Sequence, residues 1–331
     1  MAVSIEDIKK LRHMTGAGMM DCKNALIETN GDIQASIEII RKKGQAVAAK
    51  REDRQAAEGC VLAGAKEGFA AIVSLKCETD FVAKNESFRA LTKAILDVAV
   101  AAGAKSLDEL KKLPMEDGRA VEDHITDEIG KTGEKMELGE FAFIEAPTVA
   151  TYEHLGNKLA TIVGLNEAGV EEAVGREIGM QVAAMNPVSV DRDHVPANVK
   201  EEEYKVAIEK TKEEQVKKAV EVAIKKAGIN PNLVDSEDHI ESNMAKGWLT
   251  QEEADKAREI AKTVAEEKAA NLNMTMIENI ANGRMNKFYK ESCLMEQEYH
   301  RDGKMTVGQY LESVKKGLVV VEFARVNLNE D

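Results

Sequence analysis

The sequence predicts an α+β fold in which helices flank antiparallel sheet. Two short β-branched apolar runs, Phe69–Leu75 and Leu159–Asn166, each precede a helical pattern and are typical of buried strands. Residues 1–45 and the highly charged segment 197–270 instead carry apolar side chains at helical spacing. Because aromatic residues make up 4 % of the chain, the composition also favours a helix-rich protein.

Length and charge narrow the class of protein. A chain of 331 residues is long enough for two or three domains. Its net charge of −14 argues against an extended nucleic-acid-binding face, because phosphate binding depends on Lys and Arg. No apolar run reaches the roughly 18 residues of a membrane span, and the N-terminus does not resemble a secretion signal. We therefore expect a cytoplasmic protein that binds neither nucleic acid nor membrane.

The cysteines and glycine motifs indicate no cofactor. The four cysteines lie far apart, without a Cys-x-x-Cys pair or a histidine at ligand spacing, and we expect them to be reduced and structural. Gly16-Ala17-Gly18 follows a helical pattern and lacks the third glycine of a dinucleotide loop. Gly130-Lys131-Thr132 ends like a phosphate loop, but Ile125 stands where its first glycine is needed.

Residues 1–56 are expected to form a small helical domain and a linker. Ser4 suits the cap of a first helix, and turns at Thr15–Gly18 and Asn30–Asp32 separate it from a second and a third. Three short helices with tight glycine turns resemble the ubiquitin-associated fold, whose members usually bind other proteins. Residues 44–57 have the composition of a solvated connector with some helical propensity.

Residues 57–150 are expected to form the first part of an α+β core. Apolar runs at Cys60–Ala63 and Phe69–Leu75 flank a glycine turn and predict a β-hairpin. Helical patterns follow, and Phe141–Ile144 predicts a further strand. The predicted helices cover residues 84–102, a shorter segment opened by Ser106, and residues 118–129.

The segment Thr79-Asp80-Phe81-Val82 joins the strongest strand pattern to a long helix. A connection at a strand end is a place where a rigid scaffold can present side chains to a partner. Spacing alone favours a structural interpretation instead, in which Asp80 caps the helix and Phe81 packs beneath it.

Residues 151–196 and 271–331 are expected to form the second part of the core. Leu159–Asn166 aligns with Phe69–Lys76, and each run precedes a helix, which indicates an internal duplication. The second copy has no equivalent of Thr79–Val82, so this segment is the specialised one.

Residues 197–270 are predicted to form an inserted, coiled-coil-like antiparallel helical hairpin. Apolar seams run along Val216–Ala227 and Ala257–Ala265, with a break at Gly228–Pro231 between them. A capping box at Thr250–Glu253 opens the return helix. A structural spacer is favoured over a catalytic element.

The residue types favour a binding protein over an enzyme. Cys77 has Asp80 nearby, but a base such as His154 would reach it only if the two halves of the core meet there. Two alternatives remain. A polypeptide-binding adaptor would bind its partner through residues 1–56 alone, and a Cys77-dependent enzyme would turn over a small substrate.

Four motifs, in order along the chain, resemble the bacterial translation elongation factor Ts family. They are Thr15–Lys23, Asn30–Ile33, Cys77–Lys84 and Gly283–Phe288. The likeness runs from Ile5 to the C-terminal strand. It implies a guanine-nucleotide exchange factor for elongation factor Tu without catalytic residues or a metal of its own, built from a ubiquitin-associated-like domain, a two-part core and a helical hairpin.

The resemblance also implies a role for the loop Thr79–Val82. In this family the loop enters the GTPase domain of the partner and dislodges its Mg²⁺. Carried onto this chain, Asp80 and Phe81 form the wedge.

Further partner contacts are implied on both sides of this loop. The family's N-terminal domain contacts the GTPase domain, which implies Leu11, Met19 and Met20, although composition alone favours core positions for the two methionines. His154 and Gly156 lie in a loop that faces the partner in the family, whereas a lone histidine is otherwise most often a surface or packing residue. Segment 205–270 is longer than the usual family hairpin, and a dimer of such complexes stays open.

Overall fold

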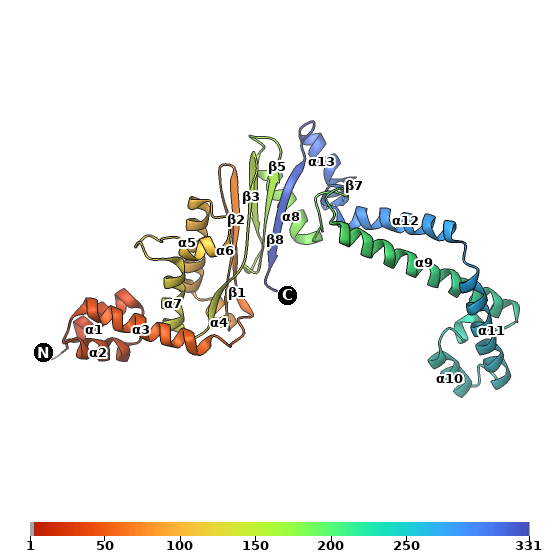
Figure 1. Ribbon diagram of the computed structural model, residues 1–331, viewed down its shortest axis with the longest axis horizontal. Coiled ribbons are helices and arrows are strands. Elements are labelled where there is room, and N and C mark those ends of the chain that lie inside the picture. The colour runs from red at the N-terminus through yellow and green to blue at the C-terminus, as the bar shows by residue number, and fades with distance from the viewer. Residues whose placement is uncertain (1–2, 331) are drawn as a thin grey trace. The chain divides into compact units, whose positions relative to one another are not determined.

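The computed structural model describes residues 3–330 (Figure 1). It divides into two compact units. Unit 1 comprises Met1–Val190 and Glu298–Asp331, and unit 2 comprises Asp191–Gln297. The mixture of helices with small antiparallel sheets confirms the predicted α+β class. Within residues 3–330, no helix is both long and apolar enough to cross a membrane.

Unit 1 begins with three helices around an apolar core of their own. Ser4 and Asp32 each accept a backbone N–H from the first turn of the helix that follows, and so cap the first and third helices. Leu11, Cys22 and Leu26 are buried between the helices. The helices are α1 (Ile5–Thr15), α2 (Met19–Glu28) and α3 (Ile33–Arg51).

The third helix continues into the segment that was expected to be a connector. Gly44 of α3 is buried and packs on α7 (Val121–Thr132). A methyl group added to Gly130 would lie only 2.8 Å from the Cα of Gly44, so the paired glycines let the two helix backbones approach closely. A solvated connector over residues 44–57 was therefore wrong for the part that belongs to α3.

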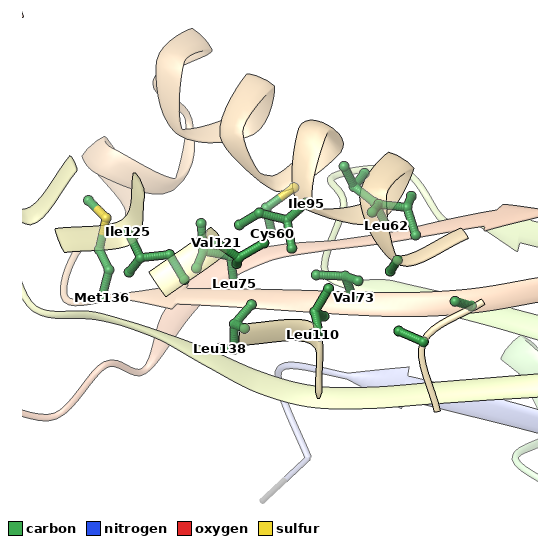
Figure 2. Packing of buried hydrophobic residues seen from close by; sticks show 14 of the residues in the cluster. Cys60, Leu62, Val73, Leu75, Ile95, Leu110, Val121, Ile125, Met136 and Leu138 are labelled. Atoms are coloured by element: carbon green, nitrogen blue, oxygen red, sulfur yellow. The ribbon is translucent and has the colours of Figure 1, made fainter. Parts of the chain in front are cut away.

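The first sheet of unit 1 has the strand order β1-β2-β3 and confirms the predicted hairpin. Helices pack on one face of it, where Ile95, Val121 and Ile125 are buried with Leu75 of the central strand (Figure 2). The strands are β1 (Glu58–Lys66), β2 (Phe69–Cys77) and β3 (Met136–Glu145). The helices besides α7 are α4 (Asp80–Ala83), α5 (Glu86–Ala102) and α6 (Leu107–Lys112).

The second sheet repeats this plan with the order β4-β5-β8. Its central strand, like β2, is followed by a helix that packs on the sheet. The strand that ends just before His154 has Ala150 as its only buried residue, which leaves a weak sequence pattern. The elements are β4 (Thr148–Glu153), β5 (Leu159–Leu165), β8 (Val320–Asn327) and α8 (Glu172–Met185).

The two sheets pack on each other through the faces that their helices leave open. Val61 and Ile72 of the first sheet share a buried cluster with Ile162 and Val326 of the second. This shared cluster holds the two sheets face to face, so that the loops at one end of the first sheet lie near the loops at one end of the second. A small hairpin and helix complete unit 1: β6 (Glu298–Tyr299), β7 (Asp302–Thr306) and α13 (Val307–Val314).

Unit 2 is helical and is organised along its longest helix, α9 (Ala197–Lys226). Val220 and Ile224 near the end of α9 cluster with Ala254 and Ala257 near the start of α11, so these helices run antiparallel. The remaining elements are η1 (Pro231–Leu233), α10 (Glu237–Ala245), α11 (Gln251–Ala270), α12 (Met274–Ser292) and η2 (Leu294–Glu296).

The boundary expected at residue 270 falls inside unit 2. Helix α12 packs on α9, and Arg284 donates to Thr211 Oγ1 at 3.1 Å and pairs with Glu214. These contacts join α12 to the helical insertion instead of to the sheets of unit 1.

Candidate functional site

The segment singled out in the sequence forms a single helical turn, α4, directly after β2. Thr79 has extended backbone, and its Oγ1 accepts the N–H of Val82 at 3.4 Å, so Thr79 is the cap of this turn. Helix α5 has a cap of its own, Asn85. The structural interpretation of Asp80 as the helix cap was therefore wrong.

Asp80 and Phe81 both lie at the surface of this turn. Lys84 Nζ donates to Asp80 Oδ2 at 2.6 Å, and this hydrogen bond, helped by the positive charge of Lys84, lowers the pKa of Asp80. The carboxylate is therefore ionised at neutral pH. The side chain of Phe81 is 82 % exposed, which rules out the expected packing beneath the helix.

Hydrogen bonds hold this turn to residues 134–135, a segment that no sequence pattern indicated. Thr79 N–H and Thr79 Oγ1 donate to the two carboxylate oxygens of Glu134, at 3.0 and 2.7 Å. In return, the N–H of Lys135 donates to Glu78 Oε1 at 2.6 Å. The chain leaving β2 and the chain entering β3 are thus linked by reciprocal hydrogen bonds between carboxylates and backbone amides.

A second exposed turn joins β4 to β5. Leu155 at its tip is 92 % exposed, and Gly156 follows with a positive φ of 91° that suits glycine. His154 is exposed, and its Nδ1 lies 2.9 Å from the hydroxyl oxygen of Tyr152. The family resemblance implied His154 and Gly156 but not Leu155, whose only signal in the sequence was an apolar residue immediately before a Gly-Asn turn.

The two turns lie at the same end of the packed sheets. Val61 N–H donates to the carbonyl of Asn157 at 2.7 Å, and Lys158 pairs with Glu58 at 2.8 Å. Glu58 is also the register partner of Cys77, the last residue of β2. We call this end of unit 1 the exposed edge. It consists of Asp80, Phe81, His154, Leu155 and Gly156.

The candidate contacts in the N-terminal helices divide into exposed and buried residues. Met19 and Met20 are 40 % and 63 % exposed, so the core positions favoured by composition were wrong. Leu11 is completely buried in the helical core. Its side chain therefore stabilises the three helices and is not available as a surface contact.

Cys77 is in no position to act as a nucleophile. It is fully buried, its Sγ donates to the carbonyl of Thr79 at 3.3 Å, and burial raises the pKa of its thiol to about 12. All four cysteines are buried and free of disulfides. Among residues 3–330, no group of three or more His, Cys, Asp or Glu side chains is arranged to hold a metal ion.

An ionised carboxylate next to an exposed Phe81, with an exposed Leu155 on a second turn at the same end of the two packed sheets, is typical of a protein-binding surface. Comparison with known proteins gives the family. The family model described as "Elongation factor TS" matches residues 78–226 and 206–330. The elongation factor Ts proteins of Phocaeicola vulgatus and Parabacteroides distasonis are 58 % and 57 % identical over 332 residues, and that of Porphyromonas gingivalis is 46 % identical over 331.

Each of these alignments spans 100 % of this chain and 100 % of the relative. The chain therefore belongs to the elongation factor Ts family, whose members are translation elongation factors with a nucleotide-exchange function.

Proposed function

We propose that this protein is the guanine-nucleotide exchange factor for elongation factor Tu and that it acts in the cytoplasm through the exposed edge. Membership in the elongation factor Ts family supports the partner. The observation that carries the mechanism is the pairing of an ionised Asp80 with an 82 % exposed Phe81 on one anchored turn. A large apolar side chain held in water by a rigid turn gains free energy when a partner covers it.

The proposed action of this wedge is electrostatic. Mg²⁺ in a GTPase bridges the nucleotide phosphates to the protein and compensates their negative charge. Insertion of Phe81 displaces the groups around this ion, and the carboxylate of Asp80 alters the charge beside it. Once Mg²⁺ is lost, the phosphates of GDP are poorly compensated and GDP leaves faster.

The energetic demand on the complex is large. A nucleotide held at nanomolar affinity has a binding free energy of about 12 kcal/mol. For exchange to be fast, the factor must weaken this binding by several kcal/mol. Coupling between two ligands is reciprocal, so GDP weakens binding of the factor by the same free energy, and incoming GTP expels it. An interface wider than one loop is therefore needed.

The rest of the exposed edge and the N-terminal helices supply this wider interface. Leu155 is the largest apolar group on the second turn, and His154 and Gly156 flank it. Met19 and Met20 offer flexible apolar side chains on α2, which suit an adaptable protein contact. Leu11 is excluded because it is buried.

We also propose a domain plan that matches these roles. The three helices α1, α2 and α3 form a ubiquitin-associated-like domain, the two sheets form a duplicated core, and α9 with α11 forms a helical hairpin. Only the first copy of the duplicated core carries α4, since β5 leads to α8 without an equivalent turn. In this proposal the wedge belongs to the first half of the core and the supporting contact to the second, and the asymmetry between the halves supports it.

The test is stopped-flow release of a fluorescent GDP analogue from elongation factor Tu of the same organism. We expect release to accelerate with the concentration of this protein and to saturate. Unchanged release at saturating protein would overturn the proposed function, and residues 1–56 alone would then be tested as an adaptor domain.

A further inference from the structure

Glu134 lies outside the exposed edge, yet it accepts two hydrogen bonds from Thr79, the residue that begins the Thr79–Val82 turn. It is separated from Thr79 by 55 residues in the sequence. Its two carboxylate oxygens accept from both donors of Thr79, one from the backbone and one from the side chain. Bonds of this kind to an ionised acceptor are roughly twice as strong as bonds between neutral groups.

The bond to the hydroxyl also orients the cap. When Thr79 Oγ1 donates its proton to Glu134, its lone pairs remain for the N–H of Val82, which begins the turn of α4. Cys77 Sγ donates to the carbonyl of Thr79 and completes the set of contacts around this residue. Thr79 is therefore held at its amide, its hydroxyl and its carbonyl.

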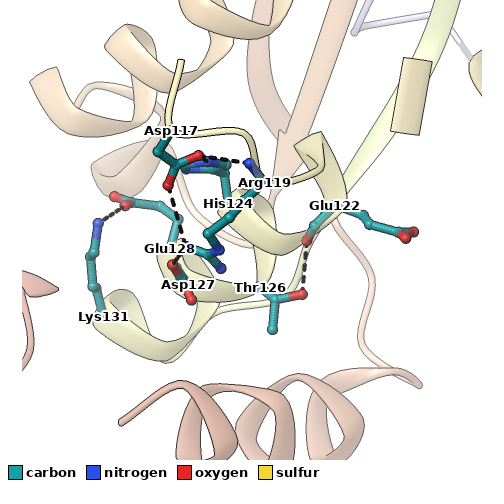
Figure 3. A network of polar contacts seen from close by, with 8 residues as sticks. All are labelled: Asp117, Arg119, Glu122, His124, Thr126, Asp127, Glu128 and Lys131. Atoms are coloured by element: carbon teal, nitrogen blue, oxygen red, sulfur yellow. Dashed lines mark hydrogen bonds and ion pairs between the residues drawn. The ribbon is translucent and has the colours of Figure 1, made fainter. Parts of the chain in front are cut away.

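Glu134 is itself held in place by α7 and β3. Its N–H donates to Thr132 Oγ1 at 3.3 Å, at the end of α7. Helix α7 is stiffened by a polar network in which Arg119 pairs with Asp127 and Lys131 with Glu128 (Figure 3). Two residues beyond Glu134, β3 begins its pairing with the end of β2.

We propose that Glu134 is a positioning residue that fixes the Thr79–Val82 turn in the orientation from which Asp80 and Phe81 act. This inference rests on the proposed exchange function. Without Glu134, the N-terminal end of this four-residue turn keeps one side-chain capping bond, from Val82 N–H to Thr79 Oγ1 at 3.4 Å, and the other bonds that remain are local ones within residues 77–85. A helix this short does not persist on its own. Phe81 would then sample many orientations, and each binding event with the partner would cost additional conformational entropy to order the turn.

The variants are chosen to distinguish the effect of the hydrogen bonds between Glu134 and Thr79 from the effect of the negative charge of Glu134. Glu134→Ala removes both bonds. Glu134→Gln keeps two bonds, because its amide oxygen accepts from the N–H and its amide nitrogen donates to the hydroxyl. Glu137→Ala is the matched control, because it removes one carboxylate from the same segment and Glu137 contacts only Lys135 among the ion pairs of the described chain.

The first readout needs no partner. Hydrogen exchange of the amides in residues 79–83, measured on the full chain by mass spectrometry, is expected to rise about tenfold or more in Glu134→Ala, as the loss of a charge-assisted hydrogen bond allows. Exchange in α5 is expected to stay unchanged. Glu134→Gln is expected to lie close to the wild type.

The second readout is GDP release. Glu134→Ala is expected to lower the maximal acceleration about tenfold while the half-saturating concentration changes less, since the other contacts remain. Glu134→Gln is expected to recover most of the rate, and Glu137→Ala to match the wild type.

The inference would be overturned if hydrogen exchange in residues 79–83 were the same in Glu134→Ala and the wild type. It would also be overturned if Glu137→Ala raised this exchange, or lowered GDP release, as much as Glu134→Ala does. Failure of the wild type itself to accelerate GDP release would instead overturn the proposed function, and the hydrogen-exchange measurement would still decide whether Glu134 holds the turn.

Discussion

Gly44 of α3 and Gly130 of α7 meet backbone to backbone, so closely that a methyl group on Gly130 would come within 2.8 Å of the Cα of Gly44. The turn after α1 makes a second contact with the same helix, because Gly16 leaves room for the aliphatic part of Lys131. The N-terminal helices are therefore packed directly on α7, the helix that precedes Glu134.

Substitution of Gly130 by alanine is expected to destabilise unit 1. The added methyl group must push α3 and α7 apart, which costs about 1–3 kcal/mol for an overpacked contact. Urea unfolding followed by circular dichroism measures this loss. The matched control is Gly283→Ala in α12, where nothing lies within 4 Å of the added methyl group. There the helix propensity of alanine is expected to stabilise by up to about 1 kcal/mol. The same gain in Gly130→Ala would contradict the close contact.

Truncation of Leu155 is expected to weaken binding without affecting the fold. Its side chain is 92 % exposed, so Leu155→Ala is expected to change the free energy of unfolding by less than about 0.5 kcal/mol. The half-saturating concentration in the GDP-release assay is expected to rise about tenfold, as for an apolar anchor of an interface. Val321→Ala is the control, because Val321 is also exposed but lies near Gly164 at the opposite end of β5. An equal effect of both substitutions would remove Leu155 from the interface.

Because two cysteine thiols are buried, we expect the protein to become less stable at alkaline pH. Burial raises the pKa of Cys60 to about 11 and that of Cys77 to about 12, from an ordinary value of 9.0. Above pH 9 the unfolded chain loses these protons while the folded chain keeps them, so stability falls as the pH rises from 9 towards 12. Urea unfolding at pH 8, 9, 10 and 11 is expected to show a shallower decline in Cys77→Ala than in the wild type.

The same substitution tests the alternative of a Cys77-dependent enzyme. With its pKa near 12, the thiol of Cys77 is ionised in only about one molecule in ten thousand at pH 8, and alkylation by iodoacetamide is expected to be slow until the chain unfolds. Cys77→Ala loses the bond from Cys77 Sγ to the carbonyl of Thr79 but keeps both bonds between Thr79 and Glu134, so it is expected to retain most of its GDP-release activity when it is folded. Rapid alkylation of Cys77 in the native protein would contradict its burial.

Unit 2 has a small core that is expected to unfold independently when it is weakened. Ile240 of α10 is buried with Ile224, Leu249 and Ala254. Ile240→Ala is expected to cost about 2–5 kcal/mol and to speed hydrogen exchange in α10 and the start of α11, while α5 in unit 1 is unaffected. Val222→Ala, at an exposed position of α9, is the control and is expected to change little. Faster exchange in both units would show that they unfold together.

The sequence predicted the central strands well because their signal is local. Both β2 and β5 are buried on two faces, so their β-branched runs stand out from the charged helices around them. The Thr79–Val82 segment was found for a similar reason, as an interruption between a strong strand and a strong helix. Its conformation was not predicted, because Thr79, Asp80 and Asn85 are all acceptable helix caps, and the bond between Thr79 and the distant Glu134 leaves no mark in the local sequence.

The missed features depend on partners far away in the chain. Glu134 is one of many acidic residues, and nothing in its neighbourhood distinguishes it from the others. Gly44 resembles any glycine in a charged segment until Gly130 is placed opposite it. Leu11 was implied as a contact by the family's N-terminal domain, yet its helical spacing with Ile8 already indicated the core side of α1, where both are buried.

Displacement of Mg²⁺ by Asp80 and Phe81 is tested most directly by GDP release in the presence of Mg²⁺ and again with Mg²⁺ chelated by EDTA. The folded variant Asp80→Ala/Phe81→Ala is compared with the wild type, with Val321→Ala as the exposed control. We predict that the double variant loses at least about tenfold of the maximal acceleration in Mg²⁺, roughly 1.4 kcal/mol, and that this deficit disappears in EDTA. Wild-type acceleration by the double variant in Mg²⁺, or the same deficit with and without Mg²⁺, would show that Asp80 and Phe81 do not act by displacing Mg²⁺.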